Sequence, residues 1–215
     1  MRKKLMKKEA LEVIDILKRI YPEAKPELNF KTPLDLLIAT ILSAQCTDIR
    51  VNKVTEPLFK ICRTAEDYIE LGEEKLSEMI KSCGLYKSKS KNIIATCNIL
   101  KEEFGGEVPK TIPLLMKLPG VGRKTANVVA SNAFGIQAIA VDTHVFRVSN
   151  RIGLANAKNV ADTEMQLMKI LPKNEWTDTH HRLIYHGRRV CKARNPLCFE
   201  CDINLVCLDY KYRRN

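Results

Sequence analysis

Long hydrophobic runs are missing from this 215-residue sequence, and no window approaches the roughly 20 consecutive apolar residues that a membrane-spanning helix needs. The basic first residues also lack the uninterrupted apolar segment of a signal peptide, because Glu9, Glu12 and Asp15 interrupt them. Internal repeats and low-complexity segments are absent as well. With 45% hydrophobic and 28% charged residues, the sequence predicts a globular protein of the cytoplasm that has no membrane partner.

Acidic residues are scarce relative to basic ones. The 36 lysines and arginines outnumber the 25 aspartates and glutamates, which gives a formal net charge of +11. An excess of this size attracts polyanions and raises the rate of encounter with them. Nucleic acid is therefore the first candidate partner, and an anionic membrane surface is the second.

Candidate strands are few, since only short runs such as 136–141 could be extended and none has an obvious pairing partner. The rest predicts successive helices, each opened by a capping residue and closed by glycine or proline. Thr32 and Pro33 precede the apolar run 36–42, which we expect to form the buried centre of a bundle. The same signals predict further caps and helix ends at Thr47, Thr64, Gly84 and Gly105. The predicted fold class is all-α.

No clear linker divides the chain, so its domains are predicted from pattern. Residues 26–136 read as one continuous helical run. Residues 137–215 hold a dense group of cysteines, and residues 1–25 predict one amphipathic helix that must pack on another element. We therefore expect two helical lobes, 26–136 and 1–25 with 137–215.

The eight cysteines divide by spacing, and disulfides are not expected in a reducing compartment. Four lie at wide intervals within helical patterns and are interpreted as small buried thiols. These are Cys46, Cys62, Cys83 and Cys97.

The other four cysteines fall within 17 residues and predict a metal centre. They are Cys191, Cys198, Cys201 and Cys207, with spacings of x6, x2 and x5. Zinc sites usually use two Cys-x2-Cys pairs and only one is present, so an iron–sulfur cluster is favoured while zinc stays open. Basic residues that would offset four thiolates or meet phosphates flank the loop: Arg188, Arg189, Lys192, Arg194, Lys211, Arg213 and Arg214.

A glycine-containing turn joins two predicted helices in the segment 118–129. The first helical pattern runs from about Ile112 to Lys117 and is stopped by Pro119, and the second begins near Arg123. The turn itself, Leu118-Pro119-Gly120-Val121-Gly122, has two glycines that would allow a tight reversal at positive φ. Backbone N–H groups exposed at the second helix start would bind a phosphate. The alternative is an ordinary connection between helices.

Lys124 lies in the first turn of this second helix, beside Arg123. A positive helix end and a neighbouring cation both disfavour its ammonium form. A lysine that loses its proton more readily is a candidate nucleophile. The alternative is a solvated surface charge.

Asp142 follows a short apolar run and precedes a predicted helix that ends at Gly153. Its simplest role is that of N-cap. Breaking a glycosidic bond builds positive charge on the sugar, and a carboxylate would stabilise that charge and help to take a proton from an amine. One residue can serve both roles. For His144, which follows closely, a structural role is preferred.

These segments together resemble the endonuclease III family of helix–hairpin–helix DNA glycosylases, which carry a [4Fe–4S] cluster. The resemblance extends over about residues 26–207. It rests on Leu118 to Asn127, on Val141-Asp142-Thr143-His144, on the cysteine spacing, and on the segments Leu42-Ser43-Ala44-Gln45 and Gly84-Leu85-Tyr86.

The resemblance implies a lobe with a six-helix barrel and a cluster lobe built from both termini, with DNA bound across the cleft between them. It implies oxidised pyrimidines in duplex DNA as substrates, attack by Lys124 on the flipped nucleotide with help from Asp142, and strand cleavage by β-elimination. Gln45 and Leu85 would fill the gap in the duplex. The hairpin residues that would hold DNA are Leu118, Gly120, Val121, Gly122 and Arg123. We expect a monomer.

Three other classes remain to be weighed. A non-catalytic helix–hairpin–helix module would bind phosphate without needing Lys124 or Asp142. An iron–sulfur redox protein would transfer electrons to a partner without any dependence on DNA. Monofunctional relatives, including adenine glycosylases, lack a lysine at the position of Lys124, so this residue favours the bifunctional branch.

Overall fold

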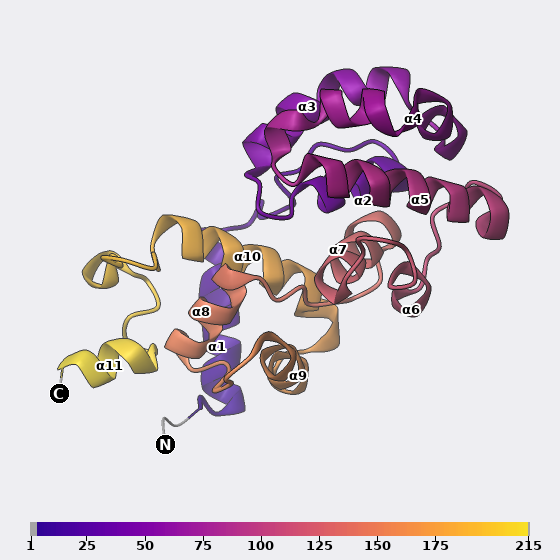
Figure 1. Ribbon diagram of the computed structural model, residues 1–215. Helices are drawn as coiled ribbons and strands as arrows, with labels where there is room; N and C mark the ends of the chain where they lie inside the picture. Colours follow the sequence, from indigo (N-terminus) through magenta and orange to yellow (C-terminus); the bar gives the residue numbers. More distant parts are fainter. Residues whose placement is uncertain (1–3, 215) are drawn as a thin grey trace. The chain divides into compact units, whose positions relative to one another are not determined.

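The structure is a computed structural model that describes residues 4–214. Within that range every regular element is a helix, which confirms the predicted all-α class. The chain forms two compact units (Figure 1). One is Pro26–Ile136, and the other comprises the described residues up to Lys25 and from Gln137 onward. None of the described helices is long and apolar enough to cross a membrane.

The Pro26–Ile136 unit is organised around a helix that is apolar on all sides. Its helices are α2 (Pro33–Leu42), α3 (Asp48–Ile61), α4 (Ala65–Met79), the short 3₁₀ helix η1 (Lys81–Cys83), α5 (Tyr86–Phe104), α6 (Ile112–Leu115) and α7 (Arg123–Phe134). Every residue of α2 from Leu34 to Leu42 is buried, and this helix packs against α3, α5 and α7. The prediction that the apolar run 36–42 is a buried centre is therefore confirmed.

Short-range caps set the ends of these helices. The hydroxyl of Thr32 accepts a hydrogen bond from the Asp35 N–H, and Thr47 and Thr64 cap α3 and α4 in the same way, as predicted. Gly105 ends α5 with φ of 59°. Such a left-handed residue after the last turn allows later N–H groups to reach the final carbonyls of the helix.

Three of the four scattered cysteines are buried as predicted. Burial raises the pKa of Cys62 to about 11 and that of Cys97 to about 12, so both stay protonated and inert. Cys46 is only half-buried, contrary to the prediction, because it lies in the connection between α2 and α3 rather than inside a helix. The helical pattern around Cys46 therefore did not predict its burial correctly.

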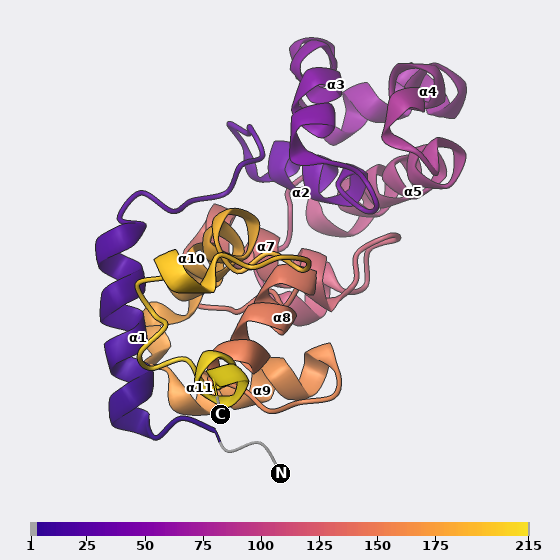
Figure 2. The same ribbon diagram turned by 90° about the vertical axis from the view of Figure 1, so that its left-hand side faces the viewer.

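The second unit is built from both ends of the chain. Its helices are α1 (Lys7–Ile20), α8 (Thr143–Ile152), α9 (Val160–Ile170), η2 (Lys173–Glu175), α10 (Trp176–Arg189), η3 (Cys198–Glu200) and α11 (Leu208–Arg214). Helix α1, seen along its length in Figure 2, packs against α10, and Val13, Ile14 and Leu17 lie in the core of this unit. Lys18 of α1 and Glu175 of η2 form an ion pair at 2.6 Å, and α8 also packs against α10.

Candidate functional site

The predicted hairpin is present, with a first helix shorter than expected. Helix α6 ends at Leu115, and Lys117 lies in the turn rather than in a helix. The turn is closed by i to i+3 hydrogen bonds, from Leu118 N to Leu115 O and from Val121 N to Leu118 O, both at 3.1 Å. These tight bonds replace the α-helical pattern before Pro119 is reached. Helix α7 begins at Arg123, as predicted.

The two hairpin glycines differ in backbone conformation. Gly120 has φ of 76°, and an added Cβ would lie 3.0 Å from Asn92 Nδ2. Gly122 has φ of −83° and ψ of 175°, which any residue adopts, so the predicted positive φ is wrong for this glycine. A Cβ on Gly122 would meet no atom within 4 Å among the residues that the structure describes. Gly120 is needed by the fold, whereas Gly122 leaves open space at the start of α7.

The start of α7 presents backbone and side-chain groups outward. Gly122 is the N-cap of α7, and because glycine has no side chain it forms no side-chain cap bond. From Ala126 to Ser131 the helix is buried, whereas Arg123 and Lys124 are exposed. The positive end of the helix and the Lys124 amine are therefore open to a partner that approaches from outside the unit.

Asp142 is the N-cap of α8, as predicted. Its Oδ1 accepts a hydrogen bond of 2.8 Å from Val145 N, and Gly153 ends the helix with φ of 102°. The residue is half-buried, and the cap bond engages only one carboxylate oxygen. Asp142 belongs to the second unit and Lys124 to the Pro26–Ile136 unit.

His144 has a structural environment. Its Nδ1 lies 3.2 Å from Arg147 Nη2, and the same Nη2 donates to the Gly187 carbonyl at 2.8 Å. Arg147 also donates to the Cys191 carbonyl from Nε and Nη2, at 3.2 and 3.1 Å. These contacts tie α8 to the end of α10 and to the first residue of the cysteine group.

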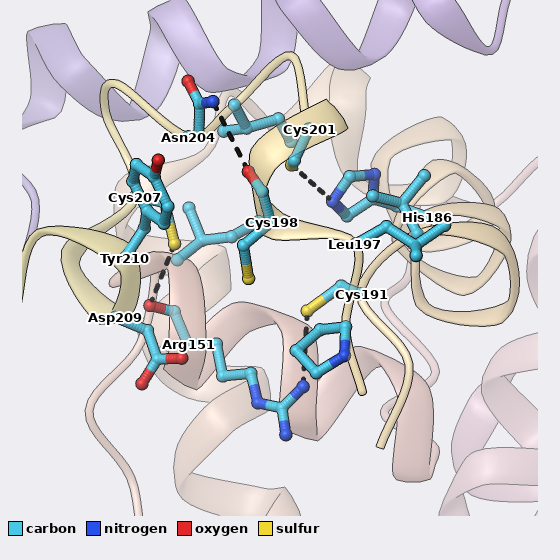
Figure 3. Close-up of a pocket in the computed structure, with 14 residues that line it drawn as sticks. Arg151, His186, Cys191, Leu197, Cys198, Cys201, Asn204, Cys207, Asp209 and Tyr210 are labelled. Carbon is cyan, nitrogen blue, oxygen red and sulfur yellow. Dashed lines mark hydrogen bonds between the residues drawn. The ribbon is translucent and has the colours of Figure 1, made fainter. Parts of the chain in front are cut away.

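The four clustered cysteines line one cavity of the second unit, and Figure 3 shows their sulfur atoms turned toward it. The cavity is otherwise lined largely by apolar side chains, among them Ile152, Leu197 and Ile203. All four cysteines are half-buried. In the described chain no three cysteine, histidine or acidic residues are grouped closely enough to share a single metal ion.

Polar contacts hold the cysteine sulfurs in place (Figure 3). Arg151 Nη1 donates to Cys191 Sγ at 3.7 Å, and Cys207 Sγ donates to the Arg151 carbonyl at 3.6 Å. Cys201 Sγ lies 3.6 Å from His186 Nε2. Neither Arg151 nor His186 was predicted at this site, because neither belongs to the cysteine spacing and no local pattern connects them to it.

Ionisation of the cysteine thiols in this cavity is unfavourable unless a cation lies nearby. Burial raises the pKa of Cys201 to about 11, and the neighbouring cysteines add to the effect. Burial also raises the pKa of Cys207. Ionising several of these thiols together requires a positive group among them, and Arg151 supplies one charge from α8. Four soft sulfur donors around one cavity fit a thiolate-ligated cluster.

Basic residues near the cysteines have mixed roles. The Arg189 guanidinium lies 4.5 Å from the centre of the Tyr185 ring, so this residue packs on an aromatic face. Lys192 and Arg194 are exposed. The side chains of Arg213 and Arg214 lie outside the described residues.

Gln45 and Leu85 lie in two connections of the Pro26–Ile136 unit. Gln45 follows α2 and Leu85 directly precedes α5. Both are exposed, and both have positive φ, 53° for Gln45 and 46° for Leu85. Among the described residues, Asn195 is the one other non-glycine residue with a positive φ.

Comparison with known proteins gives a consistent result. A family model described as HhH-GPD superfamily base excision DNA repair protein matches residues 38–173. Endonuclease III of Escherichia coli (strain K12) is 50% identical over 205 residues, which cover 95% of this chain and 97% of that protein. Endonuclease III of Bacillus subtilis (strain 168) is 49% identical over 201 residues, covering 93% and 92%.

Solved structures are similar over almost the whole chain. A structure described as a non-covalent endonuclease III–DNA complex superposes with a TM-score of 0.93 at 50% identity, covering 98% of this chain and 99% of that one. A trapped endonuclease III–DNA covalent intermediate matches with the same TM-score and identity. A thermostable thymine-DNA glycosylase matches with a TM-score of 0.87 at 23% identity, which bears on the fold alone.

Proposed function

The chain belongs to the endonuclease III family of base excision DNA repair proteins, and from that premise we propose that it is a bifunctional DNA glycosylase and AP lyase. Its substrates are oxidised pyrimidines in duplex DNA and the abasic sites that remain after base removal. The observation that carries the proposal is the exposed Lys124 on the first turn of α7, two residues after the open backbone at Gly122. The protein acts as a monomer in the cytoplasm, on the DNA of the nucleoid.

The hairpin supplies the phosphate contact. Gly122 leaves room for a DNA phosphate to approach the α7 N-terminus, where backbone N–H groups and the helix dipole favour an anion. Gly120 and Arg123 are exposed beside it, whereas the side chains of Leu118 and Val121 are buried, so these two residues would contribute through their backbone. The contact depends on no base, so it holds DNA without selecting a sequence.

Lys124 is the nucleophile. Its neutral amine attacks C1′ of the flipped nucleotide, a C–N bond forms, and the bond to the damaged base breaks while the base leaves with the bonding electrons. Loss of the amine proton and opening of the sugar give a Schiff base. Removal of a C2′ proton then expels the 3′ phosphate by β-elimination, which nicks the strand.

Asp142 assists this chemistry as an anion that stabilises the positive charge developing on the sugar, and as an acceptor for the proton of the amine. Its place at the start of α8 suits the role, because the cap bond to Val145 N fixes one oxygen. Extrusion of the nucleotide costs a few kcal/mol and leaves a gap in the duplex. Gln45 and Leu85, exposed in two connections, fill that gap.

A [4Fe–4S] cluster is held by Cys191, Cys198, Cys201 and Cys207. The four sulfurs around one cavity, with Arg151 donating to Cys191, support this assignment. When bound, the cluster supplies a covalent cross-link between segments that have little helical structure of their own. Arg151 and His186 orient two of the sulfurs from α8 and α10.

Borohydride reduction tests the nucleophile. Wild-type protein is mixed with duplex DNA that contains an abasic site or thymine glycol, and reduction of the Schiff base should leave a covalent complex visible by denaturing electrophoresis. Lys124→Ala should give no complex. Lys124→Gln, which keeps most of the side-chain length, should bind the same DNA without being trapped.

Two results would count against the proposal. If wild-type protein forms no covalent complex with either DNA, the chain is not a lyase. If Lys124→Ala is trapped as efficiently as wild type, another amine is the nucleophile, and the non-catalytic hairpin becomes the better account of the α7 N-terminus.

A further inference from the structure

Two connections of the Pro26–Ile136 unit share an unusual backbone state. Gln45 and Leu85 both occupy the left-handed region, which residues with a Cβ rarely adopt and which persists only where surrounding contacts hold it. Leu85 is 57% exposed, so packing of its own side chain does not provide the restraint. The left-handed conformation must therefore be held by contacts to the neighbouring backbone.

Lys89 provides such a restraint. It lies one turn into α5 and is only 4% exposed, which is unusual for a lysine. Its Nζ donates to three backbone carbonyls, those of Leu42 at 2.8 Å, Ala44 at 2.7 Å and Cys83 at 2.8 Å. The backbone N–H of Lys89 also donates to the Leu85 carbonyl at 2.9 Å.

The three acceptors lie in the two connections or directly before them. Leu42 is the last residue of α2, and Ala44 directly precedes Gln45. Cys83 ends η1, two residues before Leu85. One ammonium group therefore joins chain segments that are about 40 residues apart in sequence and fixes the carbonyl on the N-terminal side of each exposed residue.

The chemistry of an ammonium suits this arrangement. It has three N–H donors and no acceptor, and here each donor can meet a carbonyl at short distance. Burial lowers the pKa of Lys89, whereas the three carbonyl contacts favour the charged ammonium form. A buried lysine whose ammonium meets three backbone carbonyls does not act as an ordinary surface charge.

We propose that Lys89 is a positioning residue that locks the Gln45 and Leu85 connections into one rigid element, so that both side chains enter the duplex together when the damaged nucleotide leaves it. The inference rests on the insertion role given above to Gln45 and Leu85. Lys89 itself lies too deep to touch DNA and acts through the backbone of the two connections.

The test measures insertion separately from binding and from chemistry. The probe is a duplex with a tetrahydrofuran abasic analogue opposite 2-aminopurine, whose fluorescence rises when the base loses its stacking. The analogue cannot form a Schiff base, so only binding and insertion are observed. At saturating wild-type protein the fluorescence should rise, and in Gln45→Ala or Leu85→Ala most of the rise should be lost.

Lys89→Met should bind the duplex and lose most of the rise, and its rate of strand cleavage at a natural abasic site should fall about 10- to 100-fold. Lys101→Met removes an exposed charge from the far end of α5 and should stay within about twofold of wild type. If Lys89 acts through Leu85, the double variant Lys89→Met/Leu85→Ala should lose little more of the fluorescence rise than the more impaired of the two single variants.

Retention of the full fluorescence rise by folded Lys89→Met overturns the inference. Should Lys89→Met fail to fold, Lys89→Arg is decisive, because it keeps a cation but not the three-point geometry of an ammonium. A full rise in Lys89→Arg then overturns the inference, and a reduced rise with normal binding supports it. Failure of the proposed function is distinct, since it would appear as absence of borohydride trapping in wild type.

Discussion

At the scale of single residues, Asp142 combines an observed structural role with a proposed chemical one. Its cap bond to Val145 N is local and would exist in any helix that started with aspartate. The proposed catalytic role needs the negative charge, whereas the cap needs only an oxygen acceptor. The two roles can therefore be separated by substitution.

Asp142→Asn should keep the cap, because asparagine is as good an N-cap as aspartate, and its free energy of unfolding should stay within a few tenths of a kcal/mol of wild type. Its single-turnover rate of base removal should fall by about 10² to 10⁴-fold, since the charge is gone. Asp142→Ala should show the same kinetic loss and cost about 1 kcal/mol more in stability. Thermal unfolding and rapid-quench kinetics check both values. Full activity in Asp142→Asn would leave Asp142 with the cap role alone.

At the scale of elements, the hairpin combines a glycine that the fold needs with one that the proposed phosphate contact needs. Gly120 has a positive φ and lies against Asn92, whereas Gly122 has ordinary angles and open space around it. Backbone conformation and packing explain the glycine at position 120 but not the one at position 122. The proposed close approach of a phosphate would explain the glycine at position 122.

Gly120→Ala and Gly122→Ala should therefore have opposite phenotypes. Gly120→Ala should lower the free energy of unfolding by about 1–2 kcal/mol, because a left-handed backbone disfavours a Cβ and Asn92 must move. Gly122→Ala should unfold at or slightly above the wild-type temperature, yet bind abasic duplex roughly tenfold more weakly. Chemical denaturation and fluorescence anisotropy measure the two effects. Wild-type DNA affinity in a folded Gly122→Ala would remove the phosphate contact from this position.

At the scale of the whole molecule, each unit has its own core, and the second unit is closed by bringing the two ends of the chain together. Leu5 N donates to the Gly153 carbonyl at 2.9 Å, and α1 packs on α10. The fully described stretch between Arg189 and Leu208 contains no regular element except η3. Such a stretch depends on cross-links for its order.

Loss of the proposed cluster should destabilise the second unit. Cys198→Ser should purify without the broad visible absorption of an iron–sulfur protein and with less iron than the about four atoms per chain that a [4Fe–4S] cluster holds. Its unfolding temperature should fall by roughly 10 °C or more, because the binding energy of the group is part of the folding energy. Cys46→Ser, outside the cluster, should keep the iron. Zinc instead of iron in wild type would contradict the assignment.

Local signals in the sequence determined much of this protein. The caps at Thr32, Thr47, Thr64 and Asp142, the helix end at Gly153 and the hairpin before α7 were predicted correctly, since each depends on interactions within about four residues. The cysteine spacing identified residues of one cavity because all four cysteines lie within 17 residues of the chain.

Only the tertiary structure decided the contacts between distant segments. It placed Lys89 among the carbonyls of Leu42, Ala44 and Cys83, and it brought Arg151 to Cys191. A lysine and an arginine in amphipathic helices look like solvated charges in any local window, because nothing within one turn shows which carbonyl or sulfur will lie beside them. Burial by segments 40 or more residues away gives these side chains their partners, so their roles emerge from packing and not from pattern.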